Sequence, residues 1–421
     1  MKEASRKRHY SAWSLFREGL RGQRGWTPAW RDRDPAPAYD IVIIGGGGHG
    51  LATAYYLARQ HGIKRVALLE KGWIGGGNTG RNTTIIRSNY FHPQSAAVYD
   101  LSVDLYEGLT RELNYNIMFS QRGLVEVAHT EAELESMARA ANAMCINGIP
   151  IELLSREETL ARAPLLDPSP NTRWPVRGAL TQRRAGTARH DAVAWGYARA
   201  ADALGVHIIQ NCEVTGFETS SGRVTAVTTS RGTIRAERFG MAVAGNSSVL
   251  AKLAGFELPI QSYTLQAMVS EPVKPCLDTI VLSSTNGVYV SQSDKGELVF
   301  GGNLDRSPSY MQRGSFRVTQ SVIAPLIEMF PAFATLKLMR QWGGVVDTTP
   351  DNSPIIGPSP LPGLFLNCGW GTGGFKAIPA GGTLFAHVLA TGQHHPLSIP
   401  FDLSRYESGE LIDEAHAGVV H

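Results

Sequence analysis

Charged side chains are scarce in this chain. Asp, Glu, Lys and Arg make up 18% of its 421 residues, against roughly 25% in an average soluble protein. With 43% hydrophobic residues, this composition excludes a disordered chain and indicates a large buried core or a surface covered by another subunit. At roughly 150 residues per domain, the length predicts two or three domains.

Cysteines and long apolar runs are also few. The four cysteines lie far apart and form no CxxC pair, which excludes a disulfide framework, predicts no metal site and fits a reducing, cytoplasmic compartment. Residues 41–58 contain five glycines and 377–401 contain prolines and histidines, so neither run has the apolar character of a membrane span. We therefore expect no contact with a membrane.

Positive charge is concentrated at the N-terminus. Residues 1–38 carry nine Lys or Arg against four Asp or Glu, a net of +5, so the remainder carries 3 − 5 = −2. Aromatic side chains, including Trp13, Phe16 and Trp26, alternate with the basic ones. This pattern favours a segment that packs on a partner, or a flexible leader, over a nucleic-acid-binding arm, and it lacks the apolar core of a secretion signal.

A strand–turn–helix–strand unit follows the arm. Residues 40–44 form a β-branched run typical of a buried parallel strand, 51–61 are apolar at helical spacing, and 63–69 return as a second strand. This order predicts one half of a Rossmann-like domain.

The turn of this unit carries a dinucleotide-binding fingerprint. Gly45, Gly47 and Gly50 supply GxGxxG, whose glycines permit a tight turn, close approach of a pyrophosphate and close helix–strand packing. Glu70 ends the second strand twenty residues after Gly50, where a carboxylate accepts hydrogen bonds from ribose hydroxyls and repels a 2′-phosphate. The fingerprint predicts FAD or NAD rather than NADP.

A second glycine-rich loop favours FAD. Residues 72–90 read GWIGGGNTGRNTTIIRSNY, where a nicotinamide-binding domain normally continues with a helix. Small, hydroxyl and amide side chains suit a long ligand, although an ordinary surface loop has a similar composition. Near the C-terminus, Gly369, Gly371, Gly373 and Gly374 form another turn before a helix that begins near 377–380. The start of that helix, with Lys376 beside it, suits the negative charge of a reduced flavin, unless this lysine is simply solvated.

The remaining segments divide between two domains. The pattern predicts a helix at 192–204 capped by Asp191, a hairpin at 223–235 and a strand at 238–244, which return the chain to the nucleotide domain. We expect an α/β (α+β) fold with a discontinuous Rossmann-like FAD-binding domain and an inserted substrate or partner domain on a mixed or antiparallel sheet. The expected parts are the arm 1–37, the FAD-binding domain 38–105, 186–252 and 339–421, and the inserted domain 106–185 and 253–338.

Four long motifs resemble one family. They are residues 39–90, RRAGTARHDAVAW at 183–195, RQWGGVVDTTPDNSPIIG at 340–357 and NCGWGTGGFK at 367–376. Together they are similar to the β subunits of heterotetrameric sarcosine oxidases, and the likeness runs from about residue 38 to the C-terminus. The resemblance implies the FAD-dependent amine oxidase fold shared with glycine oxidase and D-amino acid oxidase.

The resemblance also implies an activity. Subunits of this family oxidise sarcosine at non-covalent FAD and pass electrons to a covalent FMN, which reacts with O2 to give hydrogen peroxide. The products are glycine with formaldehyde or 5,10-methylenetetrahydrofolate. Partners would be α, γ and δ subunits, with NAD and tetrahydrofolate on the α subunit.

Site residues follow from the same motifs. The resemblance places covalent FMN on His190 and the sarcosine carboxylate on Arg87 and Lys376. From the residues alone, a histidine before a helix is more often a capping or surface residue, and imidazole acts as a nucleophile in fewer cases. FAD contacts fall on Gly45, Gly47, Gly48, His49, Gly50, Glu70, Asn78, Thr79, Arg81, Asn82, Thr83, Thr84, Val214, Gly371, Gly374 and Lys376.

The sequence departs from the monomeric sarcosine oxidases at two points, and it leaves three alternative functions open. No cysteine lies near Gly343 and Gly344, where monomeric sarcosine oxidases tether FAD, and residues 261–271 contain no match to their oxygen-activating lysine. The enzymatic alternative is a dehydrogenase subunit for proline, glycine or another small secondary amine. The non-catalytic alternative is a flavin electron-relay subunit. A plain NAD dehydrogenase leaves the second loop and the C-terminal return unexplained.

Overall fold

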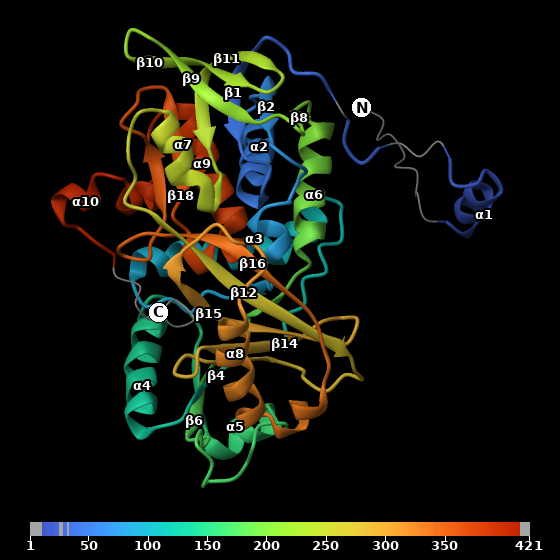
Figure 1. Cartoon of the computed structure of the whole chain (residues 1–421), viewed down its shortest axis with the longest axis vertical. Helices are drawn as coiled ribbons and strands as arrows, with labels where there is room; N and C mark the ends of the chain where they lie inside the picture. The colour runs from blue at the N-terminus through green and yellow to red at the C-terminus, as the bar shows by residue number, and fades with distance from the viewer. Residues whose placement is uncertain (1–10, 25–27, 32, 413–421) are drawn as a thin grey trace.

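Two eight-stranded sheets form the body of the molecule (Figure 1). The computed structural model describes residues 11–24, 28–31 and 33–412, so the first ten residues of the predicted arm lie outside the described part. One sheet occupies the upper half of Figure 1 and the other the lower half, and helices cover the outer faces. This arrangement is the α/β fold with an inserted mixed sheet that the sequence predicts.

The first sheet is mainly parallel, in the order β17–β18–β11–β1–β2–β8, with the hairpin β9–β10 attached to β11. Only β17 runs antiparallel to its neighbour β18 on the main path of this sheet. Its strands are β1 (Ala38–Ile44), β2 (Val66–Leu69), β8 (His207–Ile209), β9 (Val214–Ser220), β10 (Arg223–Thr229), β11 (Gly232–Met241), β17 (Ile355–Pro358) and β18 (Leu364–Cys368).

Both faces of this sheet are buried, which explains the uninterrupted apolar run of β1. Ile41 and Ile43 pack against one face and Val42 and Ile44 against the other, as expected for a parallel strand covered on both sides. The first face is covered by α2 (Gly48–Gln60), α3 (Pro93–Glu112), α6 (His190–Ala203) and α9 (Ile378–Thr391). The β9–β10 hairpin and α7 (Ser247–Leu253) cover the second.

The second sheet is mixed, in the order β16–β12–β15–β14–β13–β4–β6–β5, and only β13 and β4 pair in parallel. Its strands are β4 (Leu124–Ala128), β5 (Glu152–Ser155), β6 (Gly178–Gln182), β12 (Gln261–Pro272), β13 (Ile280–Ser283), β14 (Val288–Gln292), β15 (Glu297–Pro308) and β16 (Leu338–Thr348). Helices α4 (Glu131–Ile146), α5 (Arg156–Arg162) and α8 (Phe316–Met329) pack around it.

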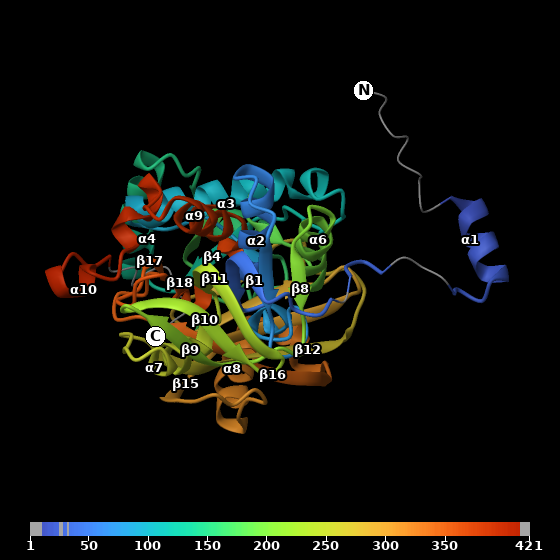
Figure 2. The same ribbon diagram turned by 90° about the horizontal axis from the view of Figure 1, so that it is seen from above.

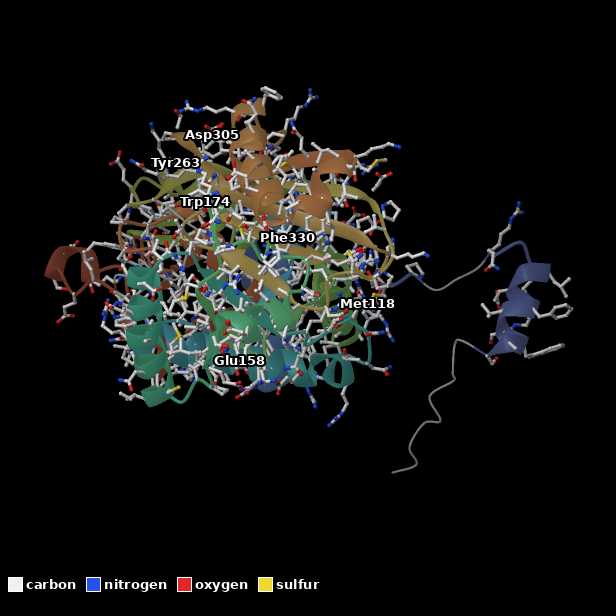
Figure 3. All side chains as sticks on the ribbon, turned by 90° about the horizontal axis from the view of Figure 1, so that it is seen from below. Met118, Glu158, Trp174, Tyr263, Asp305 and Phe330 are labelled. Carbon is white, nitrogen blue, oxygen red and sulfur yellow. The ribbon has the colours of Figure 1, made fainter. Side chains whose placement is uncertain are left out.

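Successive side chains along these strands point to opposite faces of the sheet. Val125, Val281 and Val290 pack on the side of α8, in a cluster that also holds Phe330, labelled in Figure 3. Their neighbours Leu282 and Tyr289 point the other way and line a cavity between the two sheets. The period of two along a strand therefore makes one face of this sheet a core and the other a cavity wall.

Local details differ from the sequence-based expectations at two points. The prediction that Asp191 caps the helix at 192–204 is wrong, because α6 begins at His190 and Arg189 is its N-cap. The predicted hairpin and the following strand share one long strand, β11, because its early part pairs with β10 and its later part with β1. The predicted domain boundaries stay a prediction, and β16, beyond the boundary at residue 338, pairs with β12 of the second sheet.

Shorter elements complete the fold. They include α1 (Ala12–Leu20), the two-stranded pair β3 (Ile85–Ile86) and β7 (Gly186–Thr187), α10 (Arg405–Ser408), and the 3-10 turns η1 (Asn78–Arg81), η4 (Gly371–Gly373) and η5 (Phe375–Ala377). Viewed from above, α1 lies apart from the body (Figure 2). None of the described helices is both long and apolar enough to cross a membrane.

Glycines allow the backbone of α2 to contact the backbone of the turn that follows β1. A Cβ on Gly50 would lie 1.9 Å from the carbonyl oxygen of Gly45, and one on Gly45 would lie 2.3 Å from that of Ala242 in the chain segment after β11. Gly45 also has a φ of 112°, which a residue with a side chain rarely adopts. Two of the three fingerprint glycines are therefore fixed by packing within the chain itself.

We expect Gly50→Ala to destabilise the chain by about 1–3 kcal/mol, because the added methyl group forces α2 away from β1. Gly108→Ala is the matched control, since a Cβ there meets nothing within 4 Å and α3 gains about 0.5–1 kcal/mol of helix propensity. Urea unfolding of the three chains measures both effects. Equal losses in the two variants would contradict this account of the crossing.

Candidate functional site

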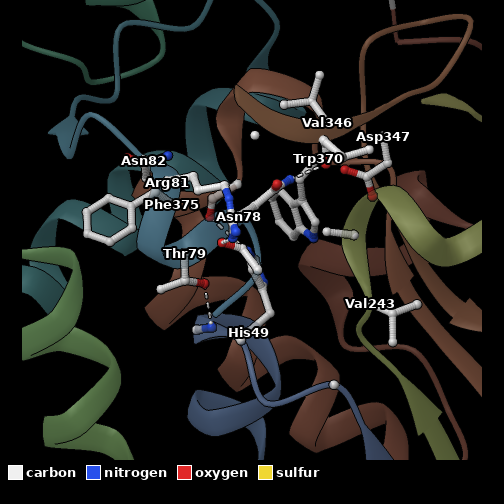
Figure 4. Close-up of a pocket in the computed structure, with 18 of the residues that line it drawn as sticks. His49, Asn78, Thr79, Arg81, Asn82, Val243, Val346, Asp347, Trp370 and Phe375 are labelled. Carbon is white, nitrogen blue, oxygen red and sulfur yellow. Dashed lines mark hydrogen bonds between the residues drawn. The ribbon is translucent and has the colours of Figure 1, made fainter. Parts of the chain in front are cut away.

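A cavity of about 590 Å³ lies between the two sheets. This volume is within the roughly 300–1,000 Å³ of typical small-molecule sites. The lining combines the glycine turn after β1, the loop after β2, the end of β16, and the C-terminal turn before α9. Figure 4 shows these segments converging, with Asn78 and Thr79 opposite Asp347 and Trp370.

The start of α2 forms one end of the cavity. Gly45, Gly47 and Gly48 line it, whereas Gly50 does not, because it packs on β1. Gly47 is the N-cap of α2 and has no side chain, and the N–H of Gly48 donates to Thr79 Oγ1 at 2.9 Å. Backbone N–H groups at a helix start form an anion site suited to a pyrophosphate.

Glu70 lies beside this turn at the end of β2. Its carboxylate oxygens accept from the N–H groups of Gly46 and Gly72, each at 2.8 Å, and the side chain lines the cavity. The two hydrogen bonds fix the carboxylate in place, and its remaining lone pairs suit ribose hydroxyls.

The second glycine-rich loop forms a side wall. Asn78, Thr79, Arg81, Asn82 and Thr83 line the cavity, whereas Thr84 does not. Thr84 has a φ of 69°, a strained conformation for a β-branched residue, where the chain turns into β3.

This loop is attached to the second sheet through β16. Asn78 Nδ2 donates to the carbonyl oxygen of Val345, and Trp342 Nε1 donates to that of Arg81 at 2.7 Å. The loop therefore depends on both sheets for its position.

His49 and Trp370 pack against each other in the cavity lining. Their ring centroids are 4.7 Å apart, and His49 Nε2 lies 2.8 Å from the carbonyl oxygen of Gly374. Burial lowers the pKa of His49 to about 4, so the imidazole is neutral and donates to that carbonyl. The pair thereby fixes the C-terminal turn against α2.

Two buried basic side chains, Arg87 and Lys376, lie close together in the cavity lining. Both line it, with side chains over the ring of Tyr90 at 5.0 and 6.0 Å from its centroid. Lys376 Nζ donates to the carbonyl oxygen of Thr372 at 3.2 Å, and Arg87 donates to Asn89 Oδ1 at 2.7 Å. Burial, and then the charge of Arg87, lower the pKa of Lys376 well below its usual value. An anion placed here would relieve this unfavourable charge.

Asp347, for which no role is predicted from the sequence, lies in the cavity wall. This carboxyl group at the end of β16 is 2% exposed and accepts from the N–H of Gly369 at 2.6 Å. Burial raises its pKa to about 7, although N–H groups of the C-terminal turn oppose the shift. In the sequence, Asp347 is a single acid directly after the apolar run 343–346. That pattern does not indicate its hydrogen bond with Gly369.

The apolar wall was also missed. Leu265, Leu282 and Tyr289 enter the cavity from three strands of the second sheet. Burial raises the pKa of Tyr289 to about 12, and its hydroxyl oxygen accepts from Thr83 Oγ1 at 3.2 Å. This wall faces the second glycine-rich loop and gives the site one apolar side.

Of the other predicted residues, Val214, Gly371 and Gly374 line the cavity and His190 does not. His190 opens α6, which contacts η1 on the second glycine-rich loop. Its side chain is 34% exposed, and its Nδ1 has no hydrogen-bond partner among the described residues. Burial lowers its pKa and Asp191 opposes the shift, so the imidazole is neutral near pH 7.

These groups fit FAD along one continuous cavity. The helix start suits the pyrophosphate, Glu70 the ribose, and the cations near the start of α9 the electron-rich edge of a flavin. Among residues 11–24, 28–31 and 33–412, no group of three His, Cys, Asp or Glu side chains is placed to hold a metal ion.

Known proteins resemble the chain over almost its whole length. The family model for FAD-dependent oxidoreductases (DAO) matches residues 40–388. Proteins named sarcosine oxidase subunit beta from Rhodobacter capsulatus, Rhizobium meliloti and Arthrobacter sp are each 52% identical to it. Their matches cover 98%, 97% and 93% of this chain and 100%, 98% and 96% of the relatives.

Solved structures have the same fold. L-Proline dehydrogenase from P. horikoshii superposes with a TM-score of 0.83 at 27% identity, covering 90% of this chain and 100% of that one. Glycine oxidase from Geobacillus kaustophilus has a TM-score of 0.79 at 24% identity, covering 88% and 99%. The second likeness concerns the fold alone.

We expect the stability of the chain to fall as pH rises through about 7, because the ionised Asp347 is disfavoured by burial. In the unfolded chain this carboxyl group is ionised at both pH 6 and pH 8. The free energy of unfolding of the wild type therefore falls by about 1.4 kcal/mol between pH 6 and pH 8, relative to that of the Asp347→Asn variant, whose side chain at this position does not titrate. Urea unfolding of both chains at the two pH values measures the difference. A difference that does not change with pH would contradict a protonated Asp347.

Proposed function

The chain belongs to the FAD-dependent oxidoreductases and, within them, to the family of sarcosine oxidase β subunits, and from this membership we propose that it oxidises the N-methyl group of sarcosine at non-covalent FAD. The observation that carries the proposal is the buried pair Arg87 and Lys376 in the same cavity as the dinucleotide fingerprint. FAD, when bound, supplies a two-electron acceptor for the C–H bond of the amine.

Arg87 and Lys376 would hold the carboxylate of sarcosine. Each is nearly inaccessible to solvent, with exposures of 4% and 6%. An arginine has the planar donor geometry that a carboxylate matches, and a low local dielectric strengthens the attraction. Holding the carboxylate at two points fixes the orientation of the rest of this small substrate.

The apolar wall would receive the other end of the substrate. Leu265 and Leu282 offer no hydrogen bonds, so a neutral amine and its methyl group are favoured there over a charged or strongly hydrated group. The protonated amine must lose its proton before oxidation, and positioning against this wall favours the neutral form. The wall also excludes water from the reacting carbon.

His190 would carry covalent FMN. Its Nδ1 makes no hydrogen bond within the described residues and lies 4.0 Å from Asp191 Oδ1, its ring is half-buried, and it lies outside the cavity assigned to FAD. A neutral imidazole nitrogen is the nucleophilic form that a covalent link requires. Because α6 contacts the loop 78–81, the second flavin would lie on the opposite side of that loop from the first.

The remaining parts of the proposal concern the acceptor and the partners. Electrons would leave through FMN to O2, giving hydrogen peroxide, with glycine and formaldehyde or 5,10-methylenetetrahydrofolate as products. The relatives carry the name subunit beta, which supports a multi-subunit enzyme. We propose α, γ and δ subunits as partners, with NAD and tetrahydrofolate on the α subunit, in the cytoplasm, where the four free cysteines remain reduced.

A dehydrogenase of another secondary amine is the second candidate, favoured by the likeness to L-proline dehydrogenase at 27% identity. Both candidates require the cation pair, so only the amine end of the substrate separates them. A pure electron relay has no use for two buried cations in the FAD cavity.

We expect Arg87→Gln to weaken binding of sarcosine by about 10–100-fold, the equivalent of losing one charge-assisted contact of about 1.5–3 kcal/mol. Arg173→Gln is the control, because that side chain is 72% exposed and far along the chain from the cavity lining. Anaerobic titration of the FAD absorbance with sarcosine, proline and glycine measures the affinities. Unchanged affinity in Arg87→Gln would support the relay, and preferential bleaching by proline would support the dehydrogenase.

We expect His190→Ala to lose covalent FMN and to keep FAD that is released by acid. Mass analysis of the denatured chain, expressed together with its partner subunits, identifies the adduct. His61→Ala is the control. His61 caps the far end of α2, so this variant should retain the adduct. Complete release of flavin from the wild-type chain, or an adduct containing AMP, would contradict the assignment of FMN to His190.

A further inference from the structure

The arm contains a short amphipathic helix, α1, whose apolar face is uncovered. Ser11 caps it by accepting from the N–H of Ser14 at 3.1 Å. Trp13, Phe16 and Leu20 lie on one face at helical spacing and are 69%, 58% and 75% exposed. The rings of Trp13 and Phe16 stack with centroids 5.8 Å apart.

Nothing in the described body covers this face. No residue of α1 is buried, and the side chains of α1 project clear of the body in Figure 3. A nine-residue helix is marginal in water unless its apolar face packs on something. A surface that receives Trp13 and Phe16 would therefore stabilise α1 as well as bind it.

The base of the arm is fixed to the body beside α6. Arg31 Nε lies 3.0 Å from both carboxylate oxygens of Asp202 near the end of α6, and Trp30 packs against the adjoining core. Asp34 pairs with Arg231. These contacts fix the point at which the arm leaves the body, next to this end of α6.

Helix α6 connects this region with the proposed FMN attachment. His190 stands at its opposite end, about 20 Å away at 1.5 Å per residue. Trp195, between the two ends, is 42% exposed. A partner that covers His190 therefore extends naturally along α6 towards the base of the arm.

The match to the Rhodobacter capsulatus relative extends into the arm. The Rhodobacter capsulatus match leaves 2% of this chain uncovered, fewer residues than α1 contains. Glycine oxidase from Geobacillus kaustophilus is covered over 99% of its length and leaves about 12% of this chain without a counterpart. The first sheet begins only at Ala38, so the arm lies outside the fold shared by the two proteins.

The charge of the arm defines the surface that would receive it. Arg17, Arg21 and Arg24 outnumber the single acid Glu18 in the described part around α1. An apolar groove with an acidic rim complements this helix, because the groove covers the aromatic side chains while the rim meets the arginines.

We propose that α1 is a docking helix, which inserts Trp13, Phe16 and Leu20 into an apolar, acid-rimmed groove on the partner subunit that covers α6 and His190. The proposal rests on the proposed function for the existence of that subunit. The arm would fasten the partner at one end of α6 while the flavin-bearing end is enclosed.

The test compares two neighbouring substitutions on opposite faces of α1. Phe16→Ser removes a 58% exposed apolar side chain from the proposed docking face, and Leu15→Ser removes a 56% exposed one from the opposite face. Both variants and the wild type would be expressed with the α, γ and δ subunits and analysed by sedimentation velocity at low and high ionic strength. We expect Phe16→Ser to weaken assembly by about tenfold or more and Leu15→Ser to leave it unchanged. High ionic strength should weaken the wild-type complex, because the arginines lose their attraction to the rim.

Other outcomes overturn the proposal. Equal effects of the two substitutions, no effect of either, or a wild-type chain that sediments apart from the other subunits would each do so. Self-association of the chain alone that is sensitive to Phe16→Ser would assign the face to a second copy instead. Anaerobic reduction of FAD by sarcosine in the same samples separates the two proposals. If assembly depends on Phe16 while sarcosine fails to reduce FAD, only the proposed function is overturned.

Discussion

Backbone contact between α2 and the first sheet is the constraint on which the rest of the structure depends. Gly50 allows the helix to lie on the carbonyl of Gly45, and Gly45 in turn lies on that of Ala242. This approach directs the N–H groups at the helix start into the cavity, where the polar part of a dinucleotide can be bound without a charged side chain. A side chain at either position would move the helix, and the cavity would lose its anion site.

The second constraint is the double role of β16. Its hydrogen bonds to β12 make it part of the second sheet, yet Val345 accepts from Asn78 and Asp347 accepts from Gly369. One strand thus fixes both glycine-rich loops that face each other across the cavity. A carboxyl group whose pKa is raised to about 7 by burial holds one of these contacts, so the geometry at that point is sensitive to protonation near neutrality.

Local patterns in the sequence predicted the elements but not the contacts between distant ones. The strand and helix of the fingerprint, Glu70 and the second glycine loop were readable because their chemistry lies within one short segment. Asp347 was missed because its partner, Gly369, is 22 residues away and directly follows β18 of the other sheet. The apolar wall was missed for a related reason: Leu282 and Tyr289 look like ordinary strand residues until the topology shows which face meets the cavity. Roles for His190 and Arg87 came from the resemblance to a family, since neither stands in a local pattern that specifies its chemistry.

The strand order of the first sheet has a consequence for how the protein is made. β18 lies beside β11, next to β1, although it is the last of the described strands along the chain, and Trp370 and Lys376 follow it. During synthesis the N-terminal unit emerges with one flank of its sheet unpaired and half of its cavity missing. FAD can bind fully only after the ribosome has released the C-terminal segment, so capture of the cofactor is a late step of maturation. Until then, the open edge of β11 is exposed to pairing with other chains, and a chaperone that shields it would raise the yield of active protein.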